Sequence, residues 1–411
     1  MFLCIAFIGG DLRMSPSGID KYRDSIVSGP ILPTMLRLGL PLMLTDVIML
    51  VYNVTDAYWL SRYSQYALAV PRMNWPIFLA FVSIVMGITN ANLAMLSQYV
   101  GAKRYDKVSD VSSKLFTLCT ATSTALFLIY EAFRHHIFAY LIMVPSEILE
   151  EALGYAEVIA FDFLAFGVAM SLATIMQSFG DTRTPAALMG AGALMNLALD
   201  PMFIIGLGPI PAMGARGAAI ATVVTRLLSG MIMLRIIMAR YPEVKIGFTR
   251  KIDRDWLLLS LKIGIPITIM TASDGFAFIF HQALVNMFGV VVAAAFAIGY
   301  IVLDMASAVL RGFTMSISIM VGQNLGAGNS SRARKTALTA AHTIMLLVFI
   351  GSIVVYLGRN HLISVFASDG AVMLEAERLV SIIAWILPLM MLSFLGMSVG
   401  RGSGHTVVPT V

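Results

Sequence analysis

Two pairs of acidic and polar side chains stand out because each pair lies in a long apolar stretch. Tyr52 and Asp56 are four residues apart, and Asn196 and Asp200 have the same spacing. Residues four apart share one face of a helix, so each carboxylate has a polar neighbour on its own face. Charged groups inside a membrane are costly and mark ion or substrate sites by default. If both pairs line one cavity, their carboxylates can share a proton or coordinate a cation.

Each carboxylate also has a structural interpretation. Asp56 lies near the end of its apolar stretch, where it can cap a helix at the outer face, whereas Asp200 lies beside Asn196 in mid-span. Pro201 follows Asp200 and frees a backbone carbonyl near that carboxylate. We favour an ion site for Asp56 and Asp200. For Asp46, a role in a proton relay and an interhelical hydrogen bond are equally favoured.

Membrane helices must position these side chains, because the composition does not suit a soluble surface. Of 411 residues, 58% are hydrophobic and 12% are charged, whereas soluble proteins carry roughly 25% charged residues. This composition argues against a soluble enzyme, a disordered chain and a nucleic-acid-binding protein. Cys4 and Cys119 lie in apolar runs and indicate neither a disulfide framework nor a thiolate metal site. No phosphate-binding loop is present, so active transport must use an ion gradient.

Ten stretches reach the length of about 20 apolar residues that a membrane helix needs. We therefore expect an all-α polytopic membrane protein with about ten transmembrane helices. Two short segments, 136–143 and 361–366, are expected to lie at a membrane interface. The ten stretches are 35–60, 74–98, 110–133, 152–178, 185–207, 216–239, 257–285, 291–321, 336–357 and 373–400.

The distribution of Lys and Arg predicts the orientation. These residues concentrate in the connections after the second, sixth and eighth stretches, and cytoplasmic loops carry such an excess. We expect a plasma-membrane protein with a cytoplasmic N-terminus, in which residues 1–30 form a cytoplasmic leader. Translation can begin at Met1 or at Met14.

An internal repeat predicts two lobes. Residues 36–41 recur as 261–266 at an offset of 225, which also relates Gly101 to Gly326. A full repeat contains six spans, an even number, so both halves have the same orientation, and a parallel repeat of this kind occurs in secondary transporters. We expect an N-terminal six-helix lobe at 31–242, a cytoplasmic inter-lobe linker at 243–256 and a C-terminal lobe at 257–411.

The second lobe contains four of the six expected helices. Val411 corresponds to residue 186 of the first half, so partners for the fifth and sixth spans are not in the sequence. We favour truncation of a twelve-helix ancestor over a protein that works with an incomplete second lobe.

In the second half, the offset places His281 at the position of Asp56, with Asp274 two turns earlier. They can form a titratable pair. The favoured interpretation is instead that His281 is buried with its hydrogen bonds satisfied and that Asp274 bonds to a neighbouring helix.

At these residues the chain resembles the multidrug and toxic compound extrusion (MATE) family, in its proton- or sodium-coupled archaeal and bacterial branch. The resemblance covers nearly the whole chain from about residue 29. It rests on segments 52–56, 98–102, 180–185, 196–201 and 323–327.

The resemblance implies an antiporter that exports amphipathic, often cationic compounds in exchange for H⁺ or Na⁺. It implies a first-lobe ion site made of Tyr52, Asp56, Asn196 and Asp200, to which Thr222 of the sixth helix is loosely assigned. It also implies two rocking lobes, no cofactor beyond the coupling ion, no enzymatic activity and a monomer. A flippase of lipid-linked precursors is the alternative transporter, but the acidic site argues against it. A truncated, non-transporting remnant is the other alternative.

Overall fold

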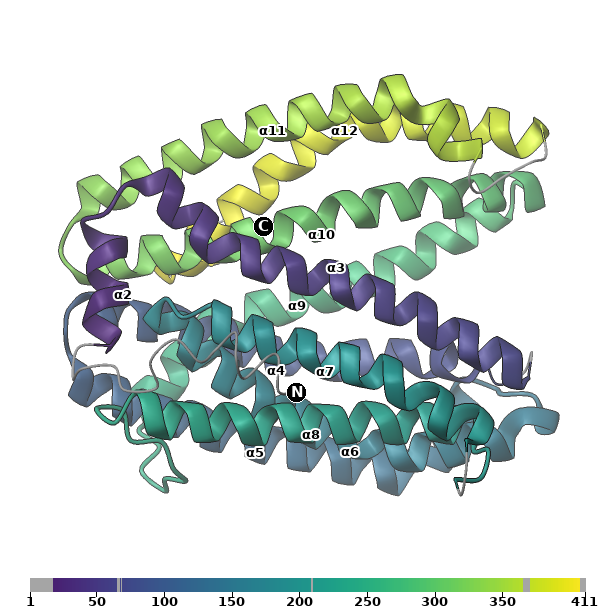
Figure 1. Cartoon of the computed structure of the whole chain (residues 1–411), viewed down its shortest axis with the longest axis horizontal. Helices are drawn as coiled ribbons and strands as arrows, with labels where there is room; N and C mark the ends of the chain where they lie inside the picture. The colour runs from purple at the N-terminus through teal and green to yellow at the C-terminus, as the bar shows by residue number, and fades with distance from the viewer. Residues whose placement is uncertain (1–17, 65–66, 68, 208–209, 365–369, 407–411) are drawn as a thin grey trace.

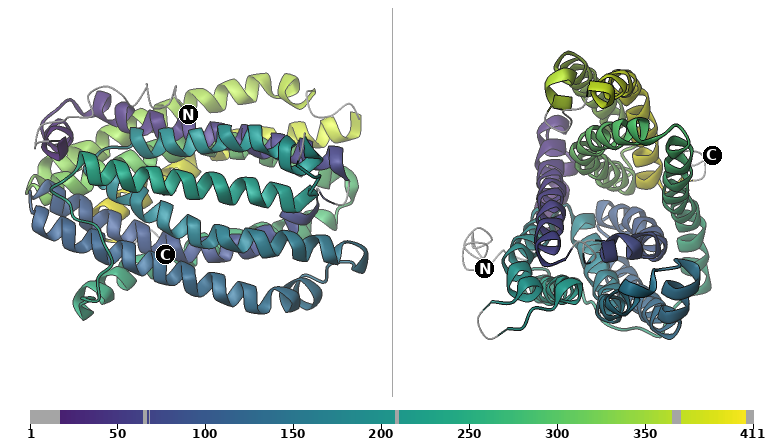
Figure 2. Two further views of the ribbon diagram at one scale, coloured as in Figure 1. Left: turned by 60° about the horizontal axis from the view of Figure 1, so that its bottom comes forward. Right: turned by 90° about the vertical axis from the view of Figure 1, so that its right-hand side faces the viewer.

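A bundle of long helices forms the structure, which is a computed structural model and describes residues 18–64, 67, 69–207, 210–364 and 370–406. The first-half elements are α2 (Gly18–Val27), α3 (Ile31–Tyr63), α4 (Ala69–Gly101), α5 (Tyr105–His136), η1 (Ile137–Leu141), α6 (Ser146–Phe179), α7 (Arg183–Pro201), η2 (Met202–Gly206) and α8 (Gly214–Arg240). The second-half elements are α9 (Arg254–Asn286), α10 (Val290–Gly326), α11 (Ser330–Ser364) and α12 (Gly370–Ser403). The long helices run roughly parallel, as the end-on view in Figure 2 shows.

The expectation of an all-α polytopic membrane protein is confirmed. Within the described ranges, nine helices are long and apolar enough to cross a membrane. The tenth expected stretch, 291–321, falls inside α10, whose side chains are described only in part. The segments 136–143 and 361–366 are not separate interfacial pieces as far as they are described. The first continues α5 through the π-helical η1, and the second begins within α11.

The two halves meet at the end of the bundle that carries α2, which we call the α2 end. Here α4, α6, α8, α10 and α12 end, and α2 packs against α4, α6 and α10 (Figure 1). Gln98 Nε2 of α4 donates to the Gly402 carbonyl at 3.3 Å, and Gln323 Nε2 of α10 donates to the Ser178 carbonyl at 2.7 Å. Each half thus donates a hydrogen bond to the other half from an equivalent glutamine.

A second pair of hydrogen bonds follows the same repeat. Thr182 Oγ1 donates to the Leu38 carbonyl at 2.8 Å, and Thr406 Oγ1 donates to the Ile263 carbonyl at 2.8 Å. Thr182 and Leu38 belong to the first half, whereas Thr406 and Ile263 are their counterparts in the second. The repeat found in the sequence therefore corresponds to equivalent contacts in the structure.

Glycine allows α4 and α10 to cross closely at the α2 end. A Cβ added to Gly101 would run into the Gln323 carbonyl, and one added to Gly326 would run into the Gln98 carbonyl. Small residues permit such close approach of helix backbones in membranes. The two glycines bring the ends of both helices into backbone contact.

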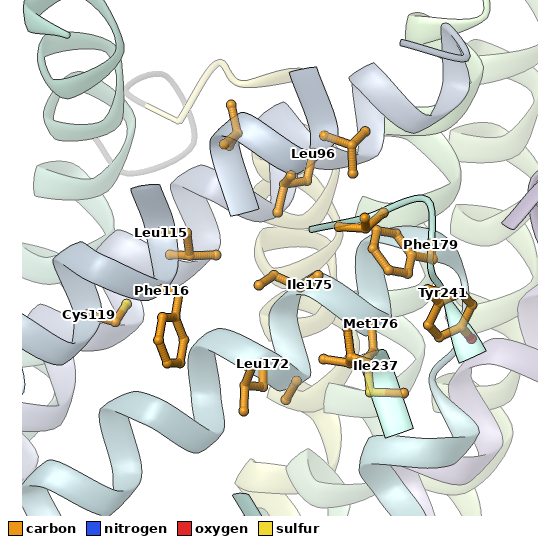
Figure 3. Packing of buried hydrophobic residues seen from close by; sticks show 14 of the residues in the cluster. Leu96, Leu115, Phe116, Cys119, Leu172, Ile175, Met176, Phe179, Ile237 and Tyr241 are labelled. Atoms are coloured by element: carbon orange, nitrogen blue, oxygen red, sulfur yellow. The ribbon is translucent and has the colours of Figure 1, made fainter. Parts of the chain in front are cut away.

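An apolar core lies inside the first half near this end. Figure 3 shows part of it, with Leu115 and Cys119 of α5, Phe179 of α6, and Ile237 and Tyr241 at and beyond the end of α8. All five side chains are fully buried. This packing holds α4, α5, α6 and α8 together behind the cavity described below.

The segment between α8 and α9 lies along α5. Ser113 Oγ donates to the Lys245 carbonyl at 3.1 Å, and Lys114 pairs with both Asp110 and Asp253. The hydrogen bond from Lys114 lowers the pKa of Asp253 below its usual range. The segment expected to link two lobes is thus attached to the first half. The lobe boundaries themselves remain a prediction.

Candidate ion-binding site

The two sequence pairs come from neighbouring helices. Tyr52 and Asp56 lie on α3, and Asn196 and Asp200 lie on α7, which packs against both α3 and α8. Tyr52, Asp56 and Asp200 are close enough to interact electrostatically. The structure therefore brings together the four residues expected to form one site.

Thr222 of α8 joins α3 to α7. Its Oγ1 lies 3.2 Å from the Tyr52 hydroxyl, accepts from Asn196 Nδ2 at 3.2 Å and donates to the Ala218 carbonyl at 3.0 Å. A hydroxyl has one hydrogen and two lone pairs. Because the hydrogen goes to Ala218, Tyr52 must be the donor to Thr222. This arrangement fixes the orientation of both Tyr52 and Asn196.

Several oxygen atoms at the site are buried without a hydrogen-bond partner among the described residues. They are Oδ1 of Asp56, both carboxylate oxygens of Asp200 and Oδ1 of Asn196. Asp200 is fully buried, and Asn196 is 3% exposed. An unsatisfied buried polar group costs about 1–3 kcal/mol. The site thus offers unpaired oxygens that suit a proton or a hard cation.

A cavity of about 140 Å³ lies beside this cluster and is lined by residues of α3, α6, α7 and α8, which do not include Asp56 or Asp200. Tyr52, Asn196 and Thr222 supply part of its polar lining. Most of the rest is apolar and includes four methionines, which are flexible and tolerate varied shapes; these are Met49, Met170, Met189 and Met233.

Sequence reasoning missed Arg226, which also lines the cavity. Its Nη1 donates to Asp162 Oδ2 at 2.9 Å, and its guanidinium lies 5.3 Å from the centre of the Phe166 ring. Asp162 is 1% exposed, so this is an ion pair between α6 and α8 inside the bundle. An arginine four residues after Thr222, in mid-span, was the available clue.

The other candidates lie outside this cluster. Asp46 of α3 pairs with Arg311 of α10 at 3.4 Å, an interhelical contact between the two halves. His281 of α9 is exposed and not buried as expected, and the side chain of Asp274 lies outside the described residues. Across the part of the chain that is described, no group of three or more His, Cys, Asp or Glu side chains could hold a metal ion.

Many apolar helices around a mostly apolar cavity with a few polar side chains are typical of a multi-pass membrane transporter. The MatE family model matches residues 41–202 and 266–411, which is most of the sequence. The chain belongs to the MatE family, whose members are transporters and not enzymes.

Two curated relatives show how far this similarity extends. Probable multidrug resistance protein YoeA of Bacillus subtilis (strain 168) is 22% identical over 376 residues, covering 90% of this chain and 81% of the relative. A FAD transporter of Shewanella oneidensis is 26% identical over 379 residues, covering 86% of this chain and 78% of the relative.

A solved structure supports the fold independently. It shows the outward-facing conformation of a multidrug resistance MATE family transporter of the MOP superfamily. The match has a TM-score of 0.86 at 18% sequence identity and covers 97% of this chain and 87% of that chain.

Proposed function

We propose that the chain is a secondary antiporter that exports amphipathic or cationic compounds in exchange for H⁺ or Na⁺. The observation that carries this proposal is the set of unpaired buried oxygens on Asp56, Asp200 and Asn196. A bound ion neutralises these groups. When the ion is released, the buried, unpaired groups again destabilise this conformation of the helices. Binding and release of the ion thereby change the relative stability of different conformations of the helices.

The apolar and acidic character of the site favours a cationic, amphipathic cargo. Methionine side chains adapt to ligands of different shape, and two nearby carboxylates attract positive charge. A relative described as a multidrug resistance protein is consistent with such cargo. Positively charged connections at the α2 end favour placing that end in the cytoplasm, with the protein in the plasma membrane and acting as a monomer.

The alternatives need a different site. A flippase of lipid-linked pyrophosphates, or a carrier of a dinucleotide such as FAD, would need positive charge facing the cargo. Arg226 is the cation among the described residues that line this cavity, and it is already paired with Asp162. A non-transporting remnant would give no gradient-driven transport at all, so the same experiments distinguish it.

Asp56→Asn and Asp200→Asn test the proposal in a pump-deficient bacterial host. Each change keeps the size of the side chain but removes its charge and its ability to release a proton. We expect both variants to lose resistance to cationic dyes and to fall to the level of the empty host, at unchanged membrane expression. Asp255→Asn, an exposed carboxylate in the first turn of α9, is the matched control and should retain resistance. Wild-type resistance in both site variants would contradict the assignment.

A further inference from the structure

A second cavity lies at the α2 end and has the opposite character. It measures about 270 Å³, and its lining includes Lys21 and Tyr22 of α2, Arg37 of α3, Arg183 at the start of α7 and Arg240 at the end of α8. Four of these five side chains are cationic. None of them belongs to the acidic site described above.

Little within the described residues balances this charge. Lys21 and Arg183 are exposed and have no carboxylate within ion-pair distance there. Arg37 donates to the uncharged Ser25 hydroxyl. Arg37 and Arg183 are close enough for their charges to repel one another. Four cations therefore line one cavity, and three of them, Lys21, Arg37 and Arg183, have no carboxylate within ion-pair distance among the described residues.

The nearest carboxylate is already engaged. Asp181 is 1% exposed and accepts hydrogen bonds from the Thr184 backbone and hydroxyl, at 3.0 and 2.7 Å, and from the Tyr241 hydroxyl at 2.7 Å. It also lies 3.7 Å from Arg240. Its charge offsets Arg240 and stabilises the turn before α7, leaving Lys21, Arg37 and Arg183 without an acidic partner.

The carboxylates of α2 interact with residues outside the cavity. Asp24 pairs with Arg23 at 2.5 Å. Asp20 accepts from the Tyr105 hydroxyl at 2.6 Å and lies 3.5 Å from Lys103. α2 therefore contributes Lys21 and Tyr22 to the cavity, while its carboxylates pair with cations outside it.

We propose that this cavity is a binding site for a phosphate-bearing anion, held chiefly by Arg37 and Arg183. Guanidinium groups bind phosphate through paired hydrogen bonds. Thr182 and Arg183 also form the N-terminus of the 19-residue α7, where the helix dipole favours an anion. A phospholipid headgroup and a free phosphate compound present the same group to these residues.

Binding would strengthen the attachment of α2. Arg332 of the second half donates to the Ile26 carbonyl of this helix and to the Gly29 carbonyl just after it. Arg23 attaches the helix to α4 by donating to the Gly101 carbonyl at 3.0 Å. An anion between Lys21 and the two arginines adds a contact to α3 and α7. Ligand binding to the folded state then raises the unfolding temperature.

Thermal unfolding of the purified full chain tests the site. In neutral detergent, pyrophosphate or inorganic phosphate is compared with chloride at equal ionic strength. In a second arm, nanodiscs of phosphatidylcholine are compared with nanodiscs that also contain phosphatidylglycerol. We expect a rise of several degrees in Tm in at least one arm. A rise in the first arm identifies free phosphate as a ligand, and a rise only in the second identifies the headgroup.

The variants assign the effect to this cavity. Arg37→Gln and the exposed Arg183→Gln should each reduce the rise in Tm to less than half. Arg250→Gln removes one exposed positive charge from the segment between α8 and α9 and should leave the rise unchanged. The inference is overturned if neither arm stabilises the protein, or if Arg183→Gln is stabilised as much as Arg250→Gln. Either result leaves the proposal for Asp56 and Asp200 intact.

Discussion

At the scale of single residues, one hydroxyl organises the candidate site. Thr222 receives hydrogen bonds from Tyr52 and Asn196, and so links α3, α7 and α8. The spacing of Tyr52 with Asp56, and of Asn196 with Asp200, could be read from the sequence because it follows the helical period. Arg226 could not be assigned this way, since its pairing with Asp162 depends on how α6 packs against α8.

Thr222→Val tests this role because it keeps the shape of the side chain and removes the hydroxyl. Tyr52 and Asn196 then lose a half-buried hydrogen-bond partner, at a cost of about 1 kcal/mol or more. We expect the apparent affinity for the driving ion to fall roughly ten-fold, since about 1.4 kcal/mol corresponds to a factor of ten. Ion-dependent transport in proteoliposomes measures the effect. Thr222→Ser restores the hydroxyl and should recover most of the affinity. Equal behaviour of the two variants would argue against the hydrogen-bond role.

At the scale of elements, the close crossing of α4 and α10 holds the α2 end together. The sequence predicted long helices from their apolar length, and the repeat related Gly101 to Gly326. It did not show that these glycines meet the glutamine carbonyls of the opposite helix, because that requires the packing of the two halves. The sequence likewise indicated a polar leader but not the helix α2 within it, because the position of α2 depends on contacts with Arg332 and Gly101.

Gly326→Val probes the crossing directly. The added side chain runs into the Gln98 carbonyl, and overpacking of this kind costs about 1–3 kcal/mol. We expect a Tm several degrees lower than wild type, measured on the purified protein in detergent. Gly351→Val in α11 is the matched control, because a Cβ there meets nothing within 4 Å. A Gly326→Val protein as stable as the control would show that the halves do not depend on this contact.

At the scale of the whole molecule, two polar regions have opposite charge. The acidic site lies among α3, α7 and α8, and the cationic cavity lies at the α2 end. The number of spans and the repeat followed from hydropathy and from matching segments. The cationic cavity could not be predicted from the sequence. Its residues are far apart in the chain and meet only in the folded bundle; they are Lys21, Arg37, Arg183 and Arg240.

The most direct test of ion coupling is dye transport into proteoliposomes under an imposed gradient. Ethidium accumulation is measured with an H⁺ gradient alone and with a Na⁺ gradient alone. The wild-type protein and Asp255→Asn should accumulate the dye under one of them. Asp56→Asn and Asp200→Asn should show no accumulation above protein-free vesicles under either gradient. Gradient-driven uptake that persists in Asp200→Asn at the wild-type rate would contradict the account.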